Sequence, residues 1–525
     1  MSMAKELMRI VRRPSLALCV LKGLRDRRFV ERSEWFDEDW YRHESGGDCS
    51  GLPPALHYSI TGFHPAVQPS PDFVPAEYLS LHPDAKGTNP LVHYEKKGKR
   101  KGYEISWLQR QSGGAPRRVS LEEHQASFPE KVRRIREKAR RGERLQTVFL
   151  VSSASMFPAR PLFSEMQADG AFATKIAVVP DFKLGLESAK AGLERCRQDI
   201  GRDFSAQDIL PVEKDSRGNW PDILKDADLA VYSSPYSDSD FRYNPHWSVG
   251  RDFLPIHVDY SYLIARYSGR IMESQNLGYF WKAFFENESM LVDYRRVSRI
   301  GGINGVCVGY MKMDALPSID RMTKPRSRKT VLIAPHHSVD GGLNGQFQVS
   351  NFLKYSGYFL TLPERFPQLD FIFRPHPFLF KALALPSLWG RKKVDKYISR
   401  LRSVPNMELS QEPDNLVDFS RSDAIVQDCG SFLPEWFYTG KPCCYMLGNK
   451  DAPARFFTEF GQECLAHCYQ AFSETDINAF LGEVVVGGKD PMKASREAFR
   501  PQVTVNHPHA ARSALDYIKE SLFRD

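Results

Sequence analysis

Several features are missing from this 525-residue sequence. No run of eighteen or more apolar residues occurs, so no segment is long enough to cross a bilayer as a helix. The one short apolar stretch near the start, 15–21, has basic residues on both sides and no small-residue cleavage site, which is not the pattern of a signal peptide. The nine cysteines are odd in number and include no CxxC pair. That usage favours reduced thiols in a cytosolic protein over a disulfide framework or a zinc site.

Nucleic-acid-binding signatures are also missing: there is no zinc finger, basic zipper or aromatic RNA-binding motif, so no nucleic-acid partner is expected. The net charge of +8 is nevertheless unevenly distributed. Residues 1–32 hold nine Lys or Arg against three acids, and a second basic cluster spans 131–141. Basic stretches with interleaved apolar residues suit an anionic membrane surface, and equally a solvated helix face. Both interpretations stay open for each cluster.

The length predicts two or three domains, and 42% hydrophobic with 26% charged residues is ordinary for globular chains. An internal repeat lies near the start. The segment Phe36-Asp-Glu-Asp-Trp-Tyr41 with His57-Tyr58 recurs 36 to 37 residues later as Phe73-Val-Pro-Ala-Glu-Tyr78 with His93-Tyr94. Such a period marks a small unit used twice, with the aromatics forming its core. The unit, about 33–104, resembles short repeats attached to bacterial polysaccharide-assembly glycosyltransferases, which implies a docking or acceptor-binding module.

Beyond a polar, basic linker and helix at 105–145, short apolar runs alternate with helical stretches, as in buried parallel sheets with flanking helices. We expect an acceptor-side domain over 146–320 and a nucleotide-side domain over 321–525. Two doubly wound domains facing a cleft, with a small mainly helical module in front, make the predicted fold class α/β of the GT-B type. The expected strands are 147–152, 175–179, 228–232, 253–257, 305–309, 330–334, 370–373, 423–426 and 443–446.

Three loops of the second domain follow expected strands and carry unusual polar residues, where open α/β sheets bind ligands. They are Ala334-Pro335-His336-His337-Ser338, Arg374-Pro375-His376-Pro377, and Gln427-Asp428-Cys429-Gly430-Ser431-Phe432, the last before a helix that carries Glu435. Each loop read alone is compatible with a rigid turn, a helix cap or a surface histidine. Their placement at the ends of one predicted sheet favours a nucleotide-phosphate site.

Each of these side chains has a use at such a site. The amides of Gly430 and Ser431 open a helix whose positive end favours phosphate. Glu435, one turn on, is placed to accept hydrogen bonds from ribose hydroxyls. Arg374 and His376 can neutralise a diphosphate leaving group, and a protonated His376 can donate to it.

The same residues resemble the CDP-glycerol glycerophosphotransferases of teichoic acid and capsule assembly. That family carries an R/K-x-HP loop, a later Asp-Ser-Gly-Ser-Phe-like turn, an acid, and a Lys-Pro before the next strand. This chain has Arg374-Pro-His-Pro377, Asp428-Cys-Gly-Ser-Phe432, Glu435 and Gly440-Lys-Pro442. Its Gly309-Tyr-Met-Lys-Met-Asp314 is similar to the family's Gly-Tyr-Pro-x-x-Asp segment at the interdomain crossing, with Met in place of Pro. The resemblance covers about 146–450.

The first domain departs from this family, because the Trp-His-Gly-Thr stretch of the teichoic acid polymerases is missing. His257 and Asp259, after an expected strand, are the acceptor-side candidates.

The resemblance implies a cytoplasmic enzyme, peripheral at the inner face of the plasma membrane, that transfers a polyol phosphate, most simply glycerol phosphate. The donor would be CDP-linked, and the acceptor a saccharide or polyol phosphate, including a lipid-linked one. His336 is expected as general base or acceptor-side contact, His376 with Arg374 on the diphosphate, and His337, Asp428, Gly430, Ser431 and Glu435 in donor binding. The residues form no dedicated metal cage and leave a divalent cation open. One alternative is a GT-B glycosyltransferase using a nucleotide sugar, including a CMP-linked sugar acid. The other is a non-enzymatic scaffold for polysaccharide assembly.

Overall fold

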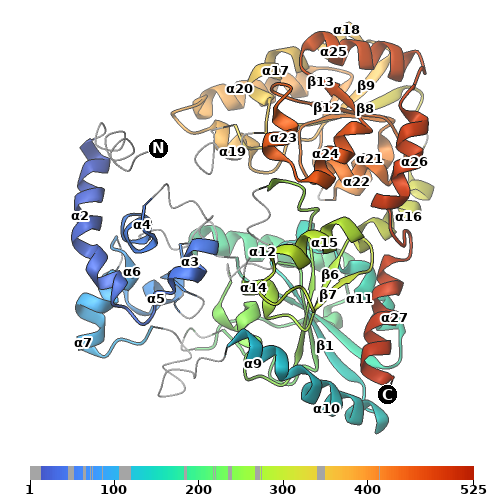
Figure 1. Ribbon diagram of the computed structural model, residues 1–525. Helices are drawn as coiled ribbons and strands as arrows, with labels where there is room; N and C mark the ends of the chain where they lie inside the picture. Colours follow the sequence, from blue (N-terminus) through green and yellow to red (C-terminus); the bar gives the residue numbers. More distant parts are fainter. Residues whose placement is uncertain are drawn as a thin grey trace.

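The structure is a computed structural model of the chain (Figure 1). It describes residues 14–44, 52–105 and 120–524, apart from 63–66, 71, 72, 74, 86, 182–185, 217, 219, 235–238, 267–271, 273, 274, 325, 340–348 and 413. Two parallel sheets stand one above the other in Figure 1, each flanked by helices. No helix in the described ranges has the length and apolar character needed to cross a membrane.

The first sheet has seven parallel strands in the order β3-β2-β1-β4-β5-β6-β7. Its interior strands are apolar on both faces, as the full burial of β4 and β5 shows, because helices cover both sides. The strands are β1 (Leu145–Val151), β2 (Phe172–Val178), β3 (Ile209–Leu210), β4 (Leu229–Tyr232), β5 (Leu254–Val258), β6 (Lys282–Phe285) and β7 (Gly305–Cys307). The accompanying helices are α9 (Leu121–Ala126), α10 (Phe128–Arg140), α11 (Arg160–Ala168), α12 (Leu186–Asp203), α14 (Gln275–Gly278) and α15 (Glu288–Val297).

The second sheet has six parallel strands in the order β10-β9-β8-β11-β12-β13. Its strands are β8 (Lys329–Ala334), β9 (Leu369–Phe373), β10 (Met407–Leu409), β11 (Ala424–Gln427), β12 (Cys443–Met446) and β13 (Tyr469–Ala471). The helices are α17 (Phe352–Phe359), α18 (Leu362–Arg365), α19 (Leu379–Leu383), α20 (Gly390–Ser403), α21 (Asn415–Arg421), α22 (Phe432–Phe437), α23 (Ala452–Phe456), α24 (Glu459–Ala466), α25 (Glu474–Ala479) and α26 (Lys493–Val503). Both strand orders are doubly wound, so the predicted α/β fold of the GT-B type is confirmed.

The chain crosses between the two sheets twice. The first crossing runs from β7 through the turn at Met311–Ala315 into α16 (Leu316–Met322). The second leads from α26 to α27 (Ala510–Phe523), which packs against the first sheet through a row of buried apolar residues. The sequence-based boundary of 321–525 for the second domain therefore differs from the structure in its last helix. The apolar spacing of α27 predicts a helix, but it cannot tell which of two sheets the helix covers.

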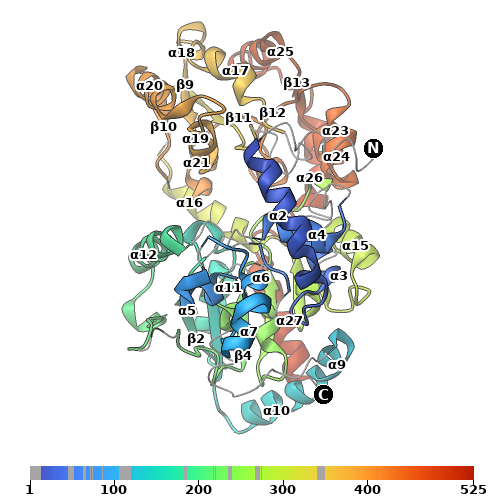
Figure 2. The same cartoon turned by 90° about the vertical axis from the view of Figure 1, so that its left-hand side faces the viewer.

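The repeat module is built from helices and short turns. Each unit places a tyrosine hydroxyl on the Nδ1 atom of a histidine: Tyr41 on His57 at 2.8 Å and Tyr78 on His93 at 2.9 Å. α2 (Pro14–Glu31) belongs to the same body, since Val30 joins its aromatic core and the Ser59 hydroxyl donates to the Gly23 carbonyl at 2.9 Å. In Figure 2 the module faces the viewer with α2 in its upper part, and the other module helices are α3 (Glu38–Glu44), α4 (Pro54–Thr61), α5 (Pro75–Leu81), α6 (Pro90–His93) and α7 (Lys99–Lys101). Residues 1–13 of the predicted basic segment, and 106–119 of the predicted linker, lie outside the described residues.

Candidate functional site

The second sheet reverses its strand order between β8 and β11, and the loops that carry His336 and Asp428 start at the ends of these two strands. The backbone N–H of His336, after β8, donates to Asp428 Oδ1, after β11, at 2.7 Å. The N–H of Asn351 donates to the other carboxylate oxygen of Asp428. Burial raises the pKa of Asp428 to about 7. Asp428 therefore ties three segments together at the crevice where doubly wound sheets bind ligands.

The loop at 374–377 lies beside the loop after β8, because the pairing of β8 with β9 continues past the strand ends. The N–H of Arg374 donates to the Ile333 carbonyl at 2.8 Å, and the N–H of His376 donates to the Pro335 carbonyl at 3.0 Å. Three imidazoles consequently meet. The ring centroid of His337 is 4.2 Å from that of His336 and 4.1 Å from that of His376. The sequence-based expectation that these loops belong to one sheet edge is realised in this geometry.

A backbone amide fixes the tautomer of one of these rings. The N–H of Phe378 donates to His376 Nδ1 at 3.1 Å, whereas His336 Nδ1 lies 2.9 Å from the Ser338 hydroxyl and 3.3 Å from the Ser338 N–H. A neutral imidazole whose Nδ1 accepts a hydrogen bond carries its proton on Nε2. Burial, with the neighbouring imidazoles, lowers the pKa of His336 well below its usual value and that of His376 to about 3. Both rings are therefore neutral at pH 7, and His376 carries its proton on Nε2.

This cluster can hold an ion. One ring nitrogen from each of the three histidines lies within 4.8 Å of the other two, close enough for a shared ion. In the neutral ring of His376, the nitrogen left after the Phe378 contact carries a proton, which suits a phosphate oxygen. The same nitrogen would have to lose that proton to bind a metal ion.

Gly430 and Ser431 lie next to Asp428, before the six-residue helix α22. A Cβ added to Gly430 would meet nothing within 4 Å, so the space above this residue is open. Among the described residues, no carbonyl or side chain accepts from the amides of Gly430 and Ser431. Two unused amides beside open space suit an anionic group.

Glu435 and Arg374 both make contacts within the protein that the sequence does not predict. Glu435 is buried, and its carboxylate accepts from Asn415 Nδ2 at 2.9 Å and from Lys312 Nζ at 3.4 Å. Ribose binding by Glu435 stays a prediction, and it requires exchange of one of these contacts. The Nη1 atom of Arg374 donates to Asp418 Oδ2 at 2.7 Å, and its Nε and Nη2 atoms have no partner among the described residues.

The first domain presents carboxylates at the ends of neighbouring strands. Asp259 follows β5 and Glu286 follows β6, and both are buried. Burial raises the pKa of Asp259 to about 7, and burial with the charge of Asp259 raises that of Glu286 well above its usual value. Glu286 Oε1 has no hydrogen-bond partner among the described residues. His257, the other acceptor-side candidate, packs against Phe280, and its burial lowers its pKa to about 3.

Glu286 is the site residue that sequence reasoning missed, because the run Lys282–Phe285 is too short and too aromatic to be recognised as a strand. The signal available in the sequence was an acidic residue directly after that apolar run, the same pattern that identified Asp259 as a candidate. Recognition of β6 as a strand would have required knowledge of its pairing with β5.

A cavity of about 230 Å³ adjoins the strand-reversal point. Asn351 lines it and connects it to the site, since its N–H bonds Asp428 and its Nδ2 donates to the Met446 carbonyl at 3.1 Å. The other walls combine aromatic rings with polar groups, a composition typical of ligand pockets. They are Val349, Ser350, Tyr445, Leu447, Gly448, Asn449, Ala452, Arg455, Phe456 and Phe457.

No protein-family model and no curated protein matches the chain. Solved structures similar to it include the wall teichoic acid polymerase TagF (H548A), at 12% identity and a TM-score of 0.47, covering 77% of this chain and 99% of that one. Another is the UDP-GlcNAc 2-epimerase of Neisseria meningitidis bound to UDP-GlcNAc, at 16% identity and a TM-score of 0.45, covering 73% of this chain and 100% of the other. At these values the likenesses do not define the activity of this chain.

Proposed function

We propose that the protein is a transferase that uses a nucleotide-activated donor, with the donor's diphosphate held at the strand-reversal point of the second sheet. The observation that carries this proposal is the meeting of His336, His337 and His376 at the strand-reversal point, where Asp428 ties their loop to the one that holds the unused amides of Gly430 and Ser431. Donors arranged in advance around an oxyanion stabilise it without reorganisation. Arg374 adds a cation through its remaining nitrogens. The nucleoside is assigned to the cavity lined by Asn351.

Polyol-phosphate transfer, most simply of glycerol phosphate from CDP-glycerol, is the specific reaction we propose. The acceptor hydroxyl oxygen forms a bond to the donor's β-phosphorus, and the bond from that phosphorus to the bridging oxygen breaks as CMP leaves. Positioning and charge neutralisation supply most of the rate in such transfers. His376 neutralises and protonates the leaving group, since an added dianion raises the pKa of a nearby imidazole.

The hydroxyl proton needs an acceptor, for which the first domain offers Asp259. A pKa of about 7 suits a general base at neutral pH. His336 was the sequence-based candidate for this role. Burial holds the pKa of His336 well below its usual value, which makes it a weak base, so we propose it as a phosphate contact instead. Lipid-linked saccharides or polyol phosphates are the proposed acceptors.

A panel of donors tests the proposal. CDP-glycerol, CDP-ribitol, UDP-GlcNAc and a CMP-linked sugar acid are each incubated with the protein, and the unfolding temperature and nucleotide release are measured. We expect stabilisation and CMP release with CDP-glycerol. Stabilisation by nucleotide sugars alone would replace the reaction with glycosyl transfer at the same diphosphate site. Stabilisation by no nucleotide would remove the donor site.

The His376→Ala variant tests the leaving-group role. We expect a fall in turnover of about 10²- to 10⁴-fold, the range for loss of an acid catalyst. His467→Ala is the matched control, because His467 precedes the edge strand β13 and stacks on Phe499. Unchanged turnover of the His376→Ala variant would dismiss the role.

A further inference from the structure

The segment 378–402, directly after the loop at 374–377, is strongly basic. It comprises α19, α20 and the turn between them. It holds seven cations and one acid, Asp395, so its net charge is +6. All seven cations are exposed: Lys381, Arg391, Lys392, Lys393, Lys396, Arg400 and Arg402.

The charge on α20 is little neutralised by the protein itself. α20 buries Val394, Tyr397 and Leu401, half-buries Ile398, and exposes its charged side chains to solvent. Arg391 pairs with Asp395 at 3.1 Å. Within the described residues, none of the other six cations of the segment pairs with a carboxylate. A helix face of this kind attracts an anionic surface.

Apolar side chains are interleaved with these cations. Phe378 is 38% and Leu385 is 45% exposed, which puts two of the largest exposed hydrophobic side chains within eight residues of each other. Lys381 Nζ lies 5.3 Å from the Phe378 ring centroid, and Lys393 Nζ lies 4.5 Å from the Trp389 ring centroid. Cations above exposed or half-buried rings are typical of segments that lie at a lipid–water interface.

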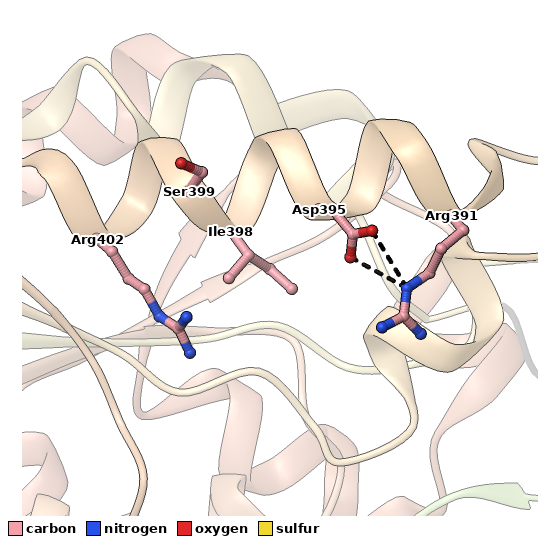
Figure 3. A pocket seen from close by; sticks show the side chains of 5 residues that line it. All are labelled: Arg391, Asp395, Ile398, Ser399 and Arg402. Carbon is pink, nitrogen blue, oxygen red and sulfur yellow. Dashed lines mark hydrogen bonds and ion pairs between the residues drawn. The ribbon is translucent and has the colours of Figure 1, made fainter.

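A hollow of about 420 Å³ runs along α20 (Figure 3). Arg391 and Arg402 stand at its two ends, and Ile398 lies between them with Asp395 and Ser399. Guanidinium groups bind phosphate oxygens, and an apolar side chain between them suits the glycerol and upper acyl carbons of a phospholipid.

We propose that the segment 378–402 docks onto an anionic lipid bilayer. Arg391 and Arg402 contact lipid phosphates, and Phe378 and Leu385 enter the headgroup region. His376 lies two residues before Phe378, so docking brings the candidate site to the membrane surface. The surface is separate from the basic segment at 1–32, and the proposal holds whatever the donor chemistry is.

Vesicle co-sedimentation of the full chain tests the docking. Vesicles of phosphatidylcholine with a quarter phosphatidylglycerol are compared with pure phosphatidylcholine, at about 0.1 M salt. We expect binding to the anionic vesicles and at least a 25-fold weaker partition for Lys392→Glu/Lys396→Glu, since each cation near the surface contributes about fivefold. Equal binding to both vesicle types would overturn the proposal.

The matched control is Lys489→Glu/Lys493→Glu, which makes the same charge change at the first residue of α26 and just before it, on the opposite side of the second domain in Figure 1. Its partition is expected to stay within about twofold, because charges more than about 10 Å from the surface are screened at this salt. Equal losses of vesicle binding in the two variants would show that binding depends on the net charge of the protein and not on the segment 378–402. Retention on an anionic polysaccharide without vesicle binding would assign the surface to a polymer instead. If the Glu variant does not fold, Lys392→Gln/Lys396→Gln replaces it.

Discussion

At the scale of residues, the candidate site combines neutral imidazoles with protonatable carboxylates, of which Asp428 lies beside the imidazoles and Asp259 in the first domain. His336 and His376 lose their charge through burial, while Asp259 and Asp428 have their pKa values raised to about 7. Both shifts follow from the removal of water, which disfavours whichever form is charged. The protein thus prepares uncharged donors for an incoming anion.

Nucleotide binding should therefore be linked to proton uptake. A diphosphate raises the pKa of His376 from about 3, so the complex binds more protons than the free protein as the pH falls through the raised pKa. We expect the Kd for CDP to decrease as pH falls from 8 to 6. Calorimetry in buffers of different ionisation enthalpy would report the uptake. Identical proton numbers in the wild type and the His376→Ala variant would contradict the linkage to this ring.

Asp259 should make the stability depend on pH in a definite direction. Its folded pKa of about 7 lies above an unfolded value of about 4, so the folded state binds more protons between these pH values. Its contribution to the free energy of unfolding is therefore highest below pH 4 and falls as pH rises to 7. Asp259→Asn lacks this loss, so we expect it to gain a few kcal/mol relative to wild type between pH 5 and pH 8 in urea unfolding.

The titratable groups that interact with this carboxyl are Glu286 and Tyr310, and both also interact with Glu435. They remain in the variant, so the comparison with wild type isolates the change at Asp259, including its effect on Glu286. Asp516→Asn, at an exposed site, serves as control and should leave the pH dependence unchanged. A parallel pH dependence of wild type and Asp259→Asn would exclude a raised pKa.

At the scale of elements, residue types at strand ends can be predicted from the sequence, whereas their partners cannot. All nine expected strands occur, because long apolar runs between helical stretches are a strong signal. The strands β3, β6, β10 and β13 have two to four residues, too few for a period to show. The contact of Arg374 with Asp418 joins a loop to a helix 44 residues away, and no local pattern encodes such a pair.

The pairing of α21 with the loop at 374–377 should be a major stabilising contact. Asp418 is fully buried and binds Arg374 at 2.7 Å and Arg421 at 3.5 Å. Asp418→Ala leaves the partly buried Arg374 without its carboxylate, while Arg421 keeps Glu408 and Glu412, so we expect a loss of about 3–5 kcal/mol in the free energy of unfolding. Asp395→Ala breaks the exposed pair on α20 and should cost less than about 1 kcal/mol. Similar costs for the two variants would show that the buried pair is not critical.

At the scale of the whole molecule, the two chain crossings lie against each other. Asn506 Nδ2 donates to the Val308 carbonyl at 3.1 Å, and the N–H of Ala511 donates to Asp314 Oδ2 at 2.8 Å. Gly309 has a φ of 94°, and an added Cβ would lie 2.2 Å from the Val505 carbonyl oxygen. Only glycine therefore permits this contact.

Gly309→Ala should force the crossings apart. Gly250→Ala is the matched control, since its φ is 69° and an added Cβ meets nothing within 4 Å. We expect the control to lose about 1 kcal/mol from backbone strain and Gly309→Ala to lose about 1–3 kcal/mol more, measured by urea unfolding. Equal losses would show that the close approach of the crossings has little energetic weight.

Because the two chain crossings lie side by side, they can serve as a hinge between the two domains. Two adjacent covalent links let the domains rotate about a line through them, but resist twisting and sliding. In Figure 1 the links α16 and α27 lie on the right and α19 and α20 on the left. Domains hinged on the right separate most on the left, where the distance from the hinge is greatest. Small rearrangements at Gly309 are then expected to produce the widest displacement at the rim next to α20.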